Sequence, residues 1–513
     1  MVKLRNSAQQ PALMVKELRR RSESPQVRQA AFEIIEANIY ACPPPHKLAL
    51  ECVNEGVCEE LVFTMSTEEW FDNVYLQDVC VSLTKALCER SIECRLRFDH
   101  RMVSYLVRTL RLYKDDSSVL IKTLNAITTL CDQSPKQRIW AAEVGAGKEV
   151  VVVAKNWKSR DWRVYNACLK SLNMLVVRCP QGKRNAGTEA LVKLALTAIE
   201  DYSRDDSFEI GRVNAQIVRG GLLLIKALIS QDDGGQKEKY DYEAYLRRGG
   251  TPVGEDLMAK EKADKSREKF LAGEEDGGGE EGEGGEDATS ELGEGQKCVK
   301  FLEDMGGIAT MVKAVTFHIA DAISIVHLLN VVHGYLYFHC GGAFDGKMIK
   351  EEISGCEELT NFLLECLMRY RGNKVIVWSA VCNLHGMCVV DSKVISHVEK
   401  FGRGNREENA DEEDSMVLDE ESLTSGKLDG CRIICSGMGE NRENVHLLEQ
   451  YCRLIMVMSK QLDARMALLR ANGIDVLEEN KSWWEERGTK GLGGYFRLSM
   501  NAHLALETGK LFS

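Results

Sequence analysis

The chain has 513 residues, of which 44% are hydrophobic and 7% aromatic, and a formal net charge of −12. The hydrophobic share is enough for a large core, and a net acidic chain argues against nucleic acid as the main partner. No run of about 18 apolar residues is present, so no membrane-spanning helix is expected, and the residues after Met1 are polar rather than typical of a signal peptide.

The 18 cysteines are scattered through apolar helical patterns. In such positions cysteine acts as a small hydrophobic residue, and a chain of this length needs no disulfides. We therefore expect a reducing compartment, either the cytoplasm alone or the cytoplasm and the nucleus. The group His327, His333, His339 and Cys340 lacks the short ligand steps of a metal site, so we predict no metal and no cofactor.

In chain order, a first helix is predicted from Pro11 and a second over residues 27–39. The arginine run that precedes Ser22 makes this serine a possible phosphorylation site. Long amphipathic helices follow at a regular interval, and polar turns able to cap them precede the first three. We predict these long helices over residues 75–88, 117–131, 163–179, 211–229, 326–337, 374–389 and 445–458.

A short phrase built around glycine returns about every 45 residues, each time ahead of an amphipathic helix, and this period is typical of helical solenoids. The phrase contains Gly56, Gly145, Gly187, Gly307, Gly355 and Gly473. One copy lacks the glycine, and His100 and Arg101 stand in its place. The terminal repeats of a solenoid must cover an exposed apolar face, a role we assign to Trp483-Trp484 and Tyr495-Phe496.

Two acidic segments interrupt the pattern. Residues 231–297 include the stretch 273–287, which is entirely Gly, Glu and Asp and cannot bury enough apolar surface to offset ordering. A second acidic loop spans 403–427 and contains Ser415, another possible phosphorylation site. The predicted organisation is therefore repeats over 1–230, a disordered insertion, central repeats over 298–402, an acidic loop, and C-terminal repeats with a cap over 428–513.

The sequence from Glu143 to Val151 resembles the junction between the first and second helices of armadillo repeats. A Leu-Asn-hydrophobe step in the long helices is similar to a second armadillo signature, although its last copy is looser. The step contains Asn125, Asn173, Asn330 and Asn383. The resemblance implies an all-α, right-handed α-solenoid of about eight or nine armadillo-type repeats. It also implies that these asparagines face a concave groove and bind the backbone of an extended peptide; the alternative is that each satisfies local backbone groups.

One armadillo class, the importin-α type of nuclear transport adaptor, pairs each groove asparagine with a tryptophan four residues earlier. The matching positions here are Ile121, Leu169, Val326 and Ser379, and Trp378 is one residue out of register. The missing tryptophans disfavour this class, which stays as the alternative to a general scaffold.

A basic cluster precedes the first asparagine. It comprises Arg95, Arg97, Arg101, Arg108 and Arg111. These arginines either attract an acidic partner or form a solvated face balanced by nearby carboxylates. Likewise, the insertion at 231–297 either folds back on the basic N-terminal half or is a solubilising loop.

No nucleophile–base pair, metal spacing or phosphate loop is visible, so we predict a protein that is not an enzyme. The predicted function is a scaffold or adaptor that binds other proteins through an extended or acidic peptide segment, or a helix. No membrane partner is expected, nucleic acid is disfavoured, and the sequence does not specify an oligomeric state.

Overall fold

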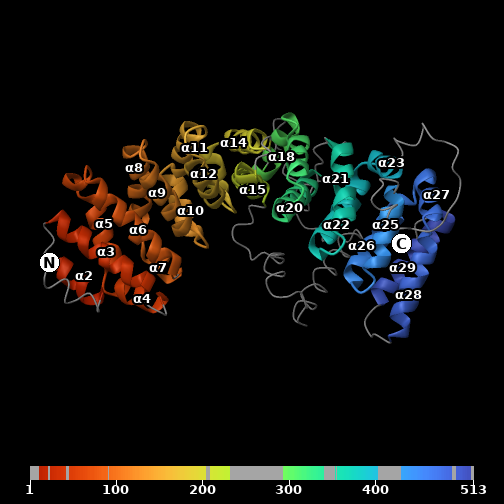
Figure 1. The fold of residues 1–513 in the computed structure, drawn as a ribbon, viewed down its shortest axis with the longest axis horizontal. Coiled ribbons are helices and arrows are strands. Elements are labelled where there is room, and N and C mark those ends of the chain that lie inside the picture. Colours follow the sequence, from red (N-terminus) through yellow and green to blue (C-terminus); the bar gives the residue numbers. More distant parts are fainter. Residues whose placement is uncertain are drawn as a thin grey trace, which may run out of the picture. The chain divides into compact units, whose positions relative to one another are not determined.

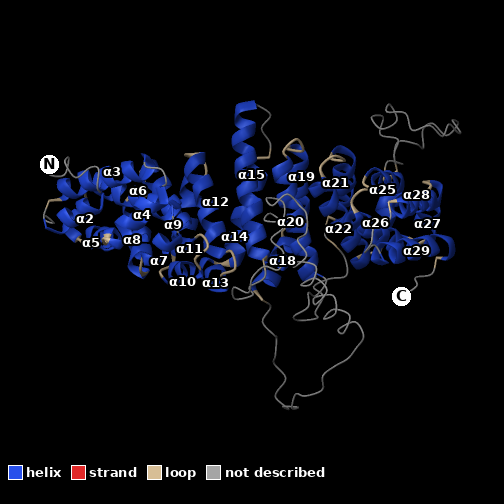
Figure 2. Ribbon diagram, turned by 90° about the horizontal axis from the view of Figure 1, so that it is seen from below, coloured by secondary structure: helices blue, strands red, loops and turns tan. Residues whose placement is uncertain are grey.

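The computed structural model consists of helices joined by turns, and its described part contains 25 α-helices, one 3-10 helix and no strand (Figure 2). The structure describes residues 11–20, 24–41, 45–90, 92–203, 208–230, 293–339, 353, 355–401, 429–487 and 493–509. The predicted all-α class is confirmed for these residues. None of the described helices is both long and apolar enough to cross a membrane. Ser22, Ser415 and the predicted loop 403–427 lie outside the described residues.

The helices alternate in chain order between three sets (Figure 1). The ladder helices are α3 (Pro25–Ala41), α6 (Val74–Arg90), α9 (Ser117–Cys131), α12 (Trp162–Val176), α15 (Phe208–Ile229), α20 (Ala322–His339), α22 (Lys374–Val390), α26 (Val445–Met458) and α29 (Gly493–Thr508). The second helices, each preceding a ladder helix, are α2 (Pro11–Arg20), α5 (Val57–Ser66), α8 (His100–Leu112), α11 (Ala146–Trp157), α14 (Thr188–Asp201), α19 (Gly307–Phe317), α21 (Cys356–Arg369), α25 (Gly430–Glu440) and α28 (Gly473–Glu486). The first helices are α4 (Pro45–Asn54), α7 (Ile92–Arg97), α10 (Pro135–Glu143), α13 (Pro180–Ala186), α18 (Glu294–Asp304), α23 (Lys393–Lys400) and α27 (Leu462–Arg470), and a 3-10 turn, Glu68–Trp70, lies between α5 and α6.

Each ladder helix packs against the next one along the chain, from α3 to α29, and against the second helix of its own unit. Such nearest-neighbour packing defines a helical repeat protein, in which each unit buries its apolar face against its neighbours. The buried apolar side chains from Met14 to Leu506 accordingly form one contiguous cluster. The long predicted helices correspond to the ladder helices, with ends that differ by a few residues.

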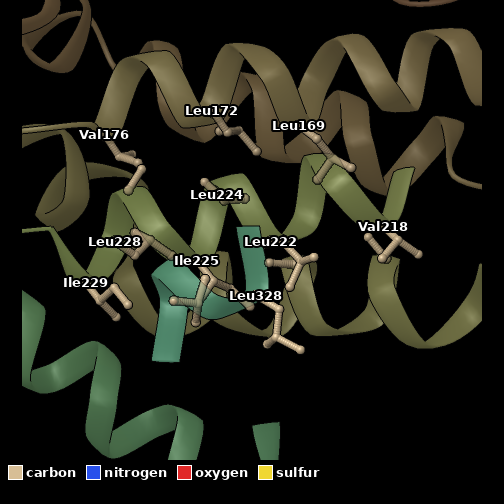
Figure 3. Packing of buried hydrophobic residues seen from close by; sticks show 14 of the residues in the cluster. Leu169, Leu172, Val176, Val218, Leu222, Leu224, Ile225, Leu228, Ile229 and Leu328 are labelled. Carbon is tan, nitrogen blue, oxygen red and sulfur yellow. The ribbon is translucent and has the colours of Figure 1, made fainter. Parts of the chain in front are cut away.

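The ladder continues across the acidic insertion because α15 packs directly against α20. Figure 3 shows Leu222 and Ile225 of α15 between Leu172 of α12 and Leu328 of α20. The predicted insertion, 231–297, extends too far, since α18 already begins at Glu294. Glu294 is buried there and accepts a 2.6 Å hydrogen bond from the Thr188 hydroxyl, which fixes an acidic residue into the fold.

The residue just before six of the second helices has a positive φ, as the recurring glycine phrase predicts. These residues are Gly56, Gly145, Gly187, Gly306, Gly355 and Asn472, with φ between 57° and 94°. In two copies of the phrase, the predicted turn glycine lies one residue after the residue that has the positive φ. Gly307 and Gly473 begin helices instead, and a Cβ on Gly307 would lie 3.1 Å from the Leu302 carbonyl oxygen. In the copy without glycine, Asp99 caps α8 by accepting from the Arg101 N–H at 2.9 Å.

Side-chain caps begin several ladder helices. Asp116 accepts hydrogen bonds from two N–H groups of α9, and Asp161 accepts one from Arg163 N–H at 2.9 Å on α12. These caps lie in two of the three predicted polar turns, and capping satisfies N–H groups that have no partner within the helix. The remaining predicted turn, residues 66–69, does not cap α6. Asn73 does so, because its side chain accepts from the Leu76 N–H at 3.1 Å.

An aromatic side chain at or near the end of most second helices binds a carbonyl of the preceding unit, and we call this contact an aromatic clasp. The donors and carbonyls are Tyr113 to Phe71, Trp157 to Lys114, Tyr202 to Lys158, Tyr370 to Ile319 and Trp484 to Arg442. His318 approaches the Tyr202 carbonyl in the same way, at 3.3 Å, which joins the units on either side of the insertion. The clasps satisfy turn carbonyls while they fix neighbouring units.

Cations of three first helices bind the carbonyls at the C-terminal ends of ladder helices. Arg95 donates to Asp132 O at 2.9 Å after α9, Arg138 donates to Val177 O after α12, and Lys183 donates to Ser230 O at 2.9 Å after α15. A positive charge there complements the negative end of the helix dipole. These cations therefore stabilise the ladder, and Lys183 is buried.

The C-terminal unit closes the apolar cluster much as predicted. Tyr495 is buried in it and Phe496 packs against it, while Trp484 forms the last clasp. The Arg487 guanidinium lies 3.6 Å above the Trp483 ring, and the Trp484 ring meets it edge-on at a centroid distance of 4.9 Å, so a cation and an aromatic ring cover this tryptophan.

The described cysteines are all free thiols, and all except Cys356 and Cys382 are buried. Burial raises the pKa of the Cys52 thiol to about 12 and that of Cys356 to about 11. These thiols stay protonated at neutral pH and pack as small apolar side chains, as predicted.

Candidate functional site

The ladder face is the set of exposed and half-buried side chains on the ladder helices. Contacts between consecutive ladder helices place these side chains side by side. Lys122 on α9 pairs with Asp78 on α6 at 2.5 Å, and beneath the face the hydroxyls of Thr128 on α9 and the buried Ser171 on α12 lie 2.8 Å apart. The ladder face therefore continues from one unit to the next as a single surface.

Three of the four predicted peptide-binding asparagines lie half-buried on the ladder face. Asn125 is on α9, Asn173 on α12 and Asn330 on α20. The Asn330 side-chain amide donates to Val326 O of its own helix at 2.8 Å, which leaves its carbonyl oxygen for another donor. Whether these residues bind a peptide stays a prediction.

Asn383 differs from the other three. Its side chain is 1% exposed, and its amide donates to Leu329 O of α20 at 2.9 Å. In α12 the residue that makes the matching contact is Ser171, whose hydroxyl donates to Leu124 O at 2.8 Å, two residues before Asn173. In this register, the α22 residue that matches Asn173 is His385, not Asn383. Asn383 joins two helices, and His385 is half-buried on the ladder face.

The positions where the importin-α type carries tryptophan do not form an aromatic row. Leu169 is buried in the core, whereas Ile121 and Val326 are half-buried. Trp378 is half-buried on α22 and packs partly against the core.

The five arginines of the predicted basic patch have different surroundings. Arg95 binds Asp132, Arg101 pairs with Asp99 at 2.6 Å, and Arg111 pairs with Glu149 at 2.8 Å. Arg108 lies over the Phe71 ring, and Arg97 lines a small hollow between α4 and α7. Since Arg95 caps α9 and two others are neutralised by carboxylates, these contacts favour the balanced face over a docking patch.

The predicted histidine–cysteine group gives no metal site in the part of the chain that the structure describes, where no cluster of three or more possible ligands occurs. His327 is buried and His333 is exposed, so these two histidines of one helix have different environments. The side chains of His339 and Cys340 lie outside the described residues.

Sequence reasoning missed the distribution of acidic residues over the ladder. Helices α9, α12, α20 and α22 contain no Asp or Glu, and α15 contains only Glu209. We call these five the acid-poor helices. In a chain of net charge −12, they form a consecutive run of the ladder. The signal was present in the sequence, but only the packing order shows that these helices are neighbours.

Some cations on the acid-poor helices have no ion-pair partner among the described residues. Lys170 on α12 is exposed and Lys226 on α15 is half-buried, and neither forms an ion pair with any residue that the structure describes. Arg163 and Arg219 do have partners, Asp161 at 2.8 Å and Asp321 at 2.7 Å. The middle of the ladder face is therefore positive.

A hollow of about 680 Å³ opens where α12 begins. It is lined by Lys158, Ser159, Arg160, Asp161, Trp162, Arg163 and Tyr202. Each of its cations pairs with a carboxylate, Lys158 with Asp201, Arg160 with Asp115 and Arg163 with Asp161. The hydrogen bond from Arg163 lowers the pKa of Asp161, so this cap stays ionised well into acid.

The first two ladder helices differ from the acid-poor helices because they contain carboxylates. Glu33 and Glu36 lie on α3, and Asp78 and Glu89 on α6. Burial, together with the charge of Asp78, raises the pKa of Glu36 despite the opposing effect of Lys122. A surface of mixed, largely paired charges at α3 and α6 therefore adjoins the positive middle of the ladder face.

Comparisons with known proteins give the fold. No family model and no curated protein matches the chain. An engineered helical-repeat protein of known crystal structure aligns with 98% of this chain and 99% of its own, with a TM-score of 0.52 and 13% identity. A second engineered protein aligns with 63% of this chain and 97% of its own, with a TM-score of 0.41 and 13% identity. A structure from a study of a phosphorylation switch in the cadherin–β-catenin interaction covers 98% and 96% of the two chains, with a TM-score of 0.37 and 12% identity. The first likeness supports a helical repeat fold.

Proposed function

We propose that this protein is a non-catalytic scaffold or adaptor that binds an extended segment of another protein along its ladder face. The observation that carries the proposal is the run of acid-poor helices with Lys170 and Lys226 on their surface. A solenoid offers an extended surface, and a continuous row of parallel helices suits an extended chain.

The parallel alignment of the ladder helices supports binding of an extended segment across them. Arg219 of α15 meets Asp321 just before α20, and Ile229, ten residues further along α15, meets Gly334, thirteen residues after Asp321. An extended partner would cross the helices roughly at right angles and meet one helix about every three residues, given interaxial distances of about 10 Å and about 3.3 Å per residue.

The proposed architecture is a right-handed armadillo-type solenoid of nine units, one for each ladder helix. The left-handed turn residues and the order of first, second and ladder helices support this assignment. The proposal includes a cytoplasmic location, or cytoplasmic and nuclear, in keeping with the free thiols.

An importin-α-like adaptor is the alternative. It would bind a basic localisation peptide, and the carboxylates of α3 and α6 favour such a ligand at one end of the ladder. The next five ladder helices, which are the acid-poor helices, disfavour a basic peptide because the positive side chains there repel it. Direct titration with a basic localisation peptide separates the two functions.

Affinity capture from the native cell tests the scaffold proposal. Wild type is compared with Asn125→Ala/Asn173→Ala and with Lys170→Glu/Lys226→Glu, and Lys148→Glu/Lys193→Glu on the second helices α11 and α14 is the charge-matched control. We expect the two ladder variants to lose a partner that the control retains, at unchanged melting temperatures. Equal partners for all four proteins would refute binding at the ladder face.

A further inference from the structure

The ladder face changes character in the order of its helices, from mixed paired charges at α3 and α6, to positive at α12 and α15, to uncharged at α20 and α22. At the first end Glu33, Glu36, Asp78 and Glu89 have Lys85 and Lys122 as ion-pair partners or neighbours. These lysines are already paired and the carboxylates repel a negative partner segment, so these helices limit how far such a segment extends.

The middle favours carboxylates. Lys170 and Lys226 lie on adjacent ladder helices that pack together, and neither is neutralised by the described residues. No acidic side chain of α12 competes with a partner for these cations, and the ion pair of Arg163 stays within its own helix cap. An acidic segment would gain attraction without displacing an existing ion pair.

The face of α20 and α22 is uncharged apart from Lys374 at its edge and any protonated histidine. Val389 on α22 is 61% exposed and Trp378 on the same helix is half-buried, whereas Ile323, 52% exposed, lies in the first turn of α20 at the edge of the face. Exposed apolar side chains on a row that continues from a charged surface mark a place for apolar partner residues.

We infer that the partner is an extended segment in which a block of acidic residues adjoins a block of apolar or aromatic residues. The acidic block lies over α9, α12 and α15, and the apolar block lies over α20 and α22. At about three residues per helix, the acidic block is about six to nine residues long and the apolar block about six. This inference rests on the proposed function, because it specifies the chemistry of the segment that the ladder face binds.

Selection from a random peptide library tests the inference without knowledge of the partner. The full-length protein is the bait, and displayed peptides of 16 random residues are long enough, at about 50 Å extended, to cover α9 to α22. We expect the retained peptides to share an acidic block next to an apolar block. Lys170→Glu/Lys226→Glu should reduce the affinity for such a peptide on the order of 10-fold and remove the preference for acidic residues. Lys148→Glu/Lys193→Glu should leave both the affinity and the preference unchanged.

Two further variants test the order of the blocks. Val389→Glu, at an exposed position where folding is not at risk, should reduce the apolar preference and leave the acidic one. Glu33→Lys/Glu36→Lys should lengthen the acidic block by several residues. Retention of basic peptides, or acidic preference that survives Lys170→Glu/Lys226→Glu, would overturn the inference while the scaffold proposal stands. Retention of no peptide of any composition would overturn both.

Discussion

The first two ladder helices and the middle of the acid-poor run differ in surface while they share one packing scheme. On α6 Glu89 pairs with Lys85 and Asp78 pairs with Lys122 of α9, whereas Lys170 and Lys226 on α12 and α15 form no ion pair with the described residues. Yet the same ladder contacts, helix caps and buried leucines hold both regions. The comparison teaches that buried residues determine the solenoid and leave the ladder face free to specify a partner.

The largest effect should come from the shared core and should be similar in both regions. Leu83 on α6 and Leu222 on α15 are both fully buried. We expect Leu83→Ala and Leu222→Ala each to reduce the free energy of unfolding by about 2–5 kcal/mol, because each leaves a cavity between ladder helices. Urea denaturation measures the loss, and a value below about 1 kcal/mol for one of them would contradict a common packing scheme.

A clasp should contribute less than a core leucine. The Tyr202 hydroxyl donates to Lys158 O at 2.9 Å, so Tyr202→Phe keeps the ring and removes only this bond. We expect a loss of about 1 kcal/mol, since a turn carbonyl loses its partner. Tyr105→Phe on α8 is the matched control, because its hydroxyl bonds to no residue within the described ranges. Equal stability of both variants would show that the clasps are incidental.

The acid stability of the positive middle should depend on Asp161. The hydrogen bond from Arg163 lowers the pKa of Asp161 in the folded state. Its contribution is therefore present above the unfolded value of about 3.9 and is lost as the pH falls through the lower folded value. We expect Asp161→Asn to be less stable than wild type at pH 6, by less than about 1 kcal/mol because Arg163 is largely exposed. The difference should vanish near pH 2; a difference that persists there would assign the effect to packing.

The smallest effect on stability, and the largest on binding, should come from the lysines of the ladder face. Lys170 is exposed, so we expect Lys170→Glu to change the free energy of unfolding by less than about 0.5 kcal/mol. Thermal melting measured beside partner binding separates the two roles. A large loss of stability would mean that Lys170 supports the fold.

The fold was largely accessible from the sequence because a repeat multiplies every local signal. The glycine phrase and the long amphipathic helices predicted the order of elements, and errors were confined to boundaries, such as Gly307 in place of Gly306 and an insertion that extends past Glu294. The clasps were not predicted, because the carbonyl that Tyr202 binds is defined only when two units pack.

The candidate site was less accessible, because it depends on register between helices. The sequence step around Asn383 cannot show that this residue lies two positions out of register with Asn173. The register is set by which residue of α22 reaches Leu329 O. Arg95 looked like a free cation because its partners, Asp132 and its carbonyl, lie 37 residues away. The acid-poor run required knowledge of which helices are neighbours.

Site-specific photo-crosslinking tests the central claim most directly. A photoreactive amino acid replaces Asn173 on the ladder face in one protein and Val152, exposed on the second helix α11, in another. In native cells we expect position 173 to capture a partner whose crosslinked segment contains an acidic block, and position 152 to capture none of it. Capture of the same partner at position 152 and not at 173 would contradict binding at the ladder face.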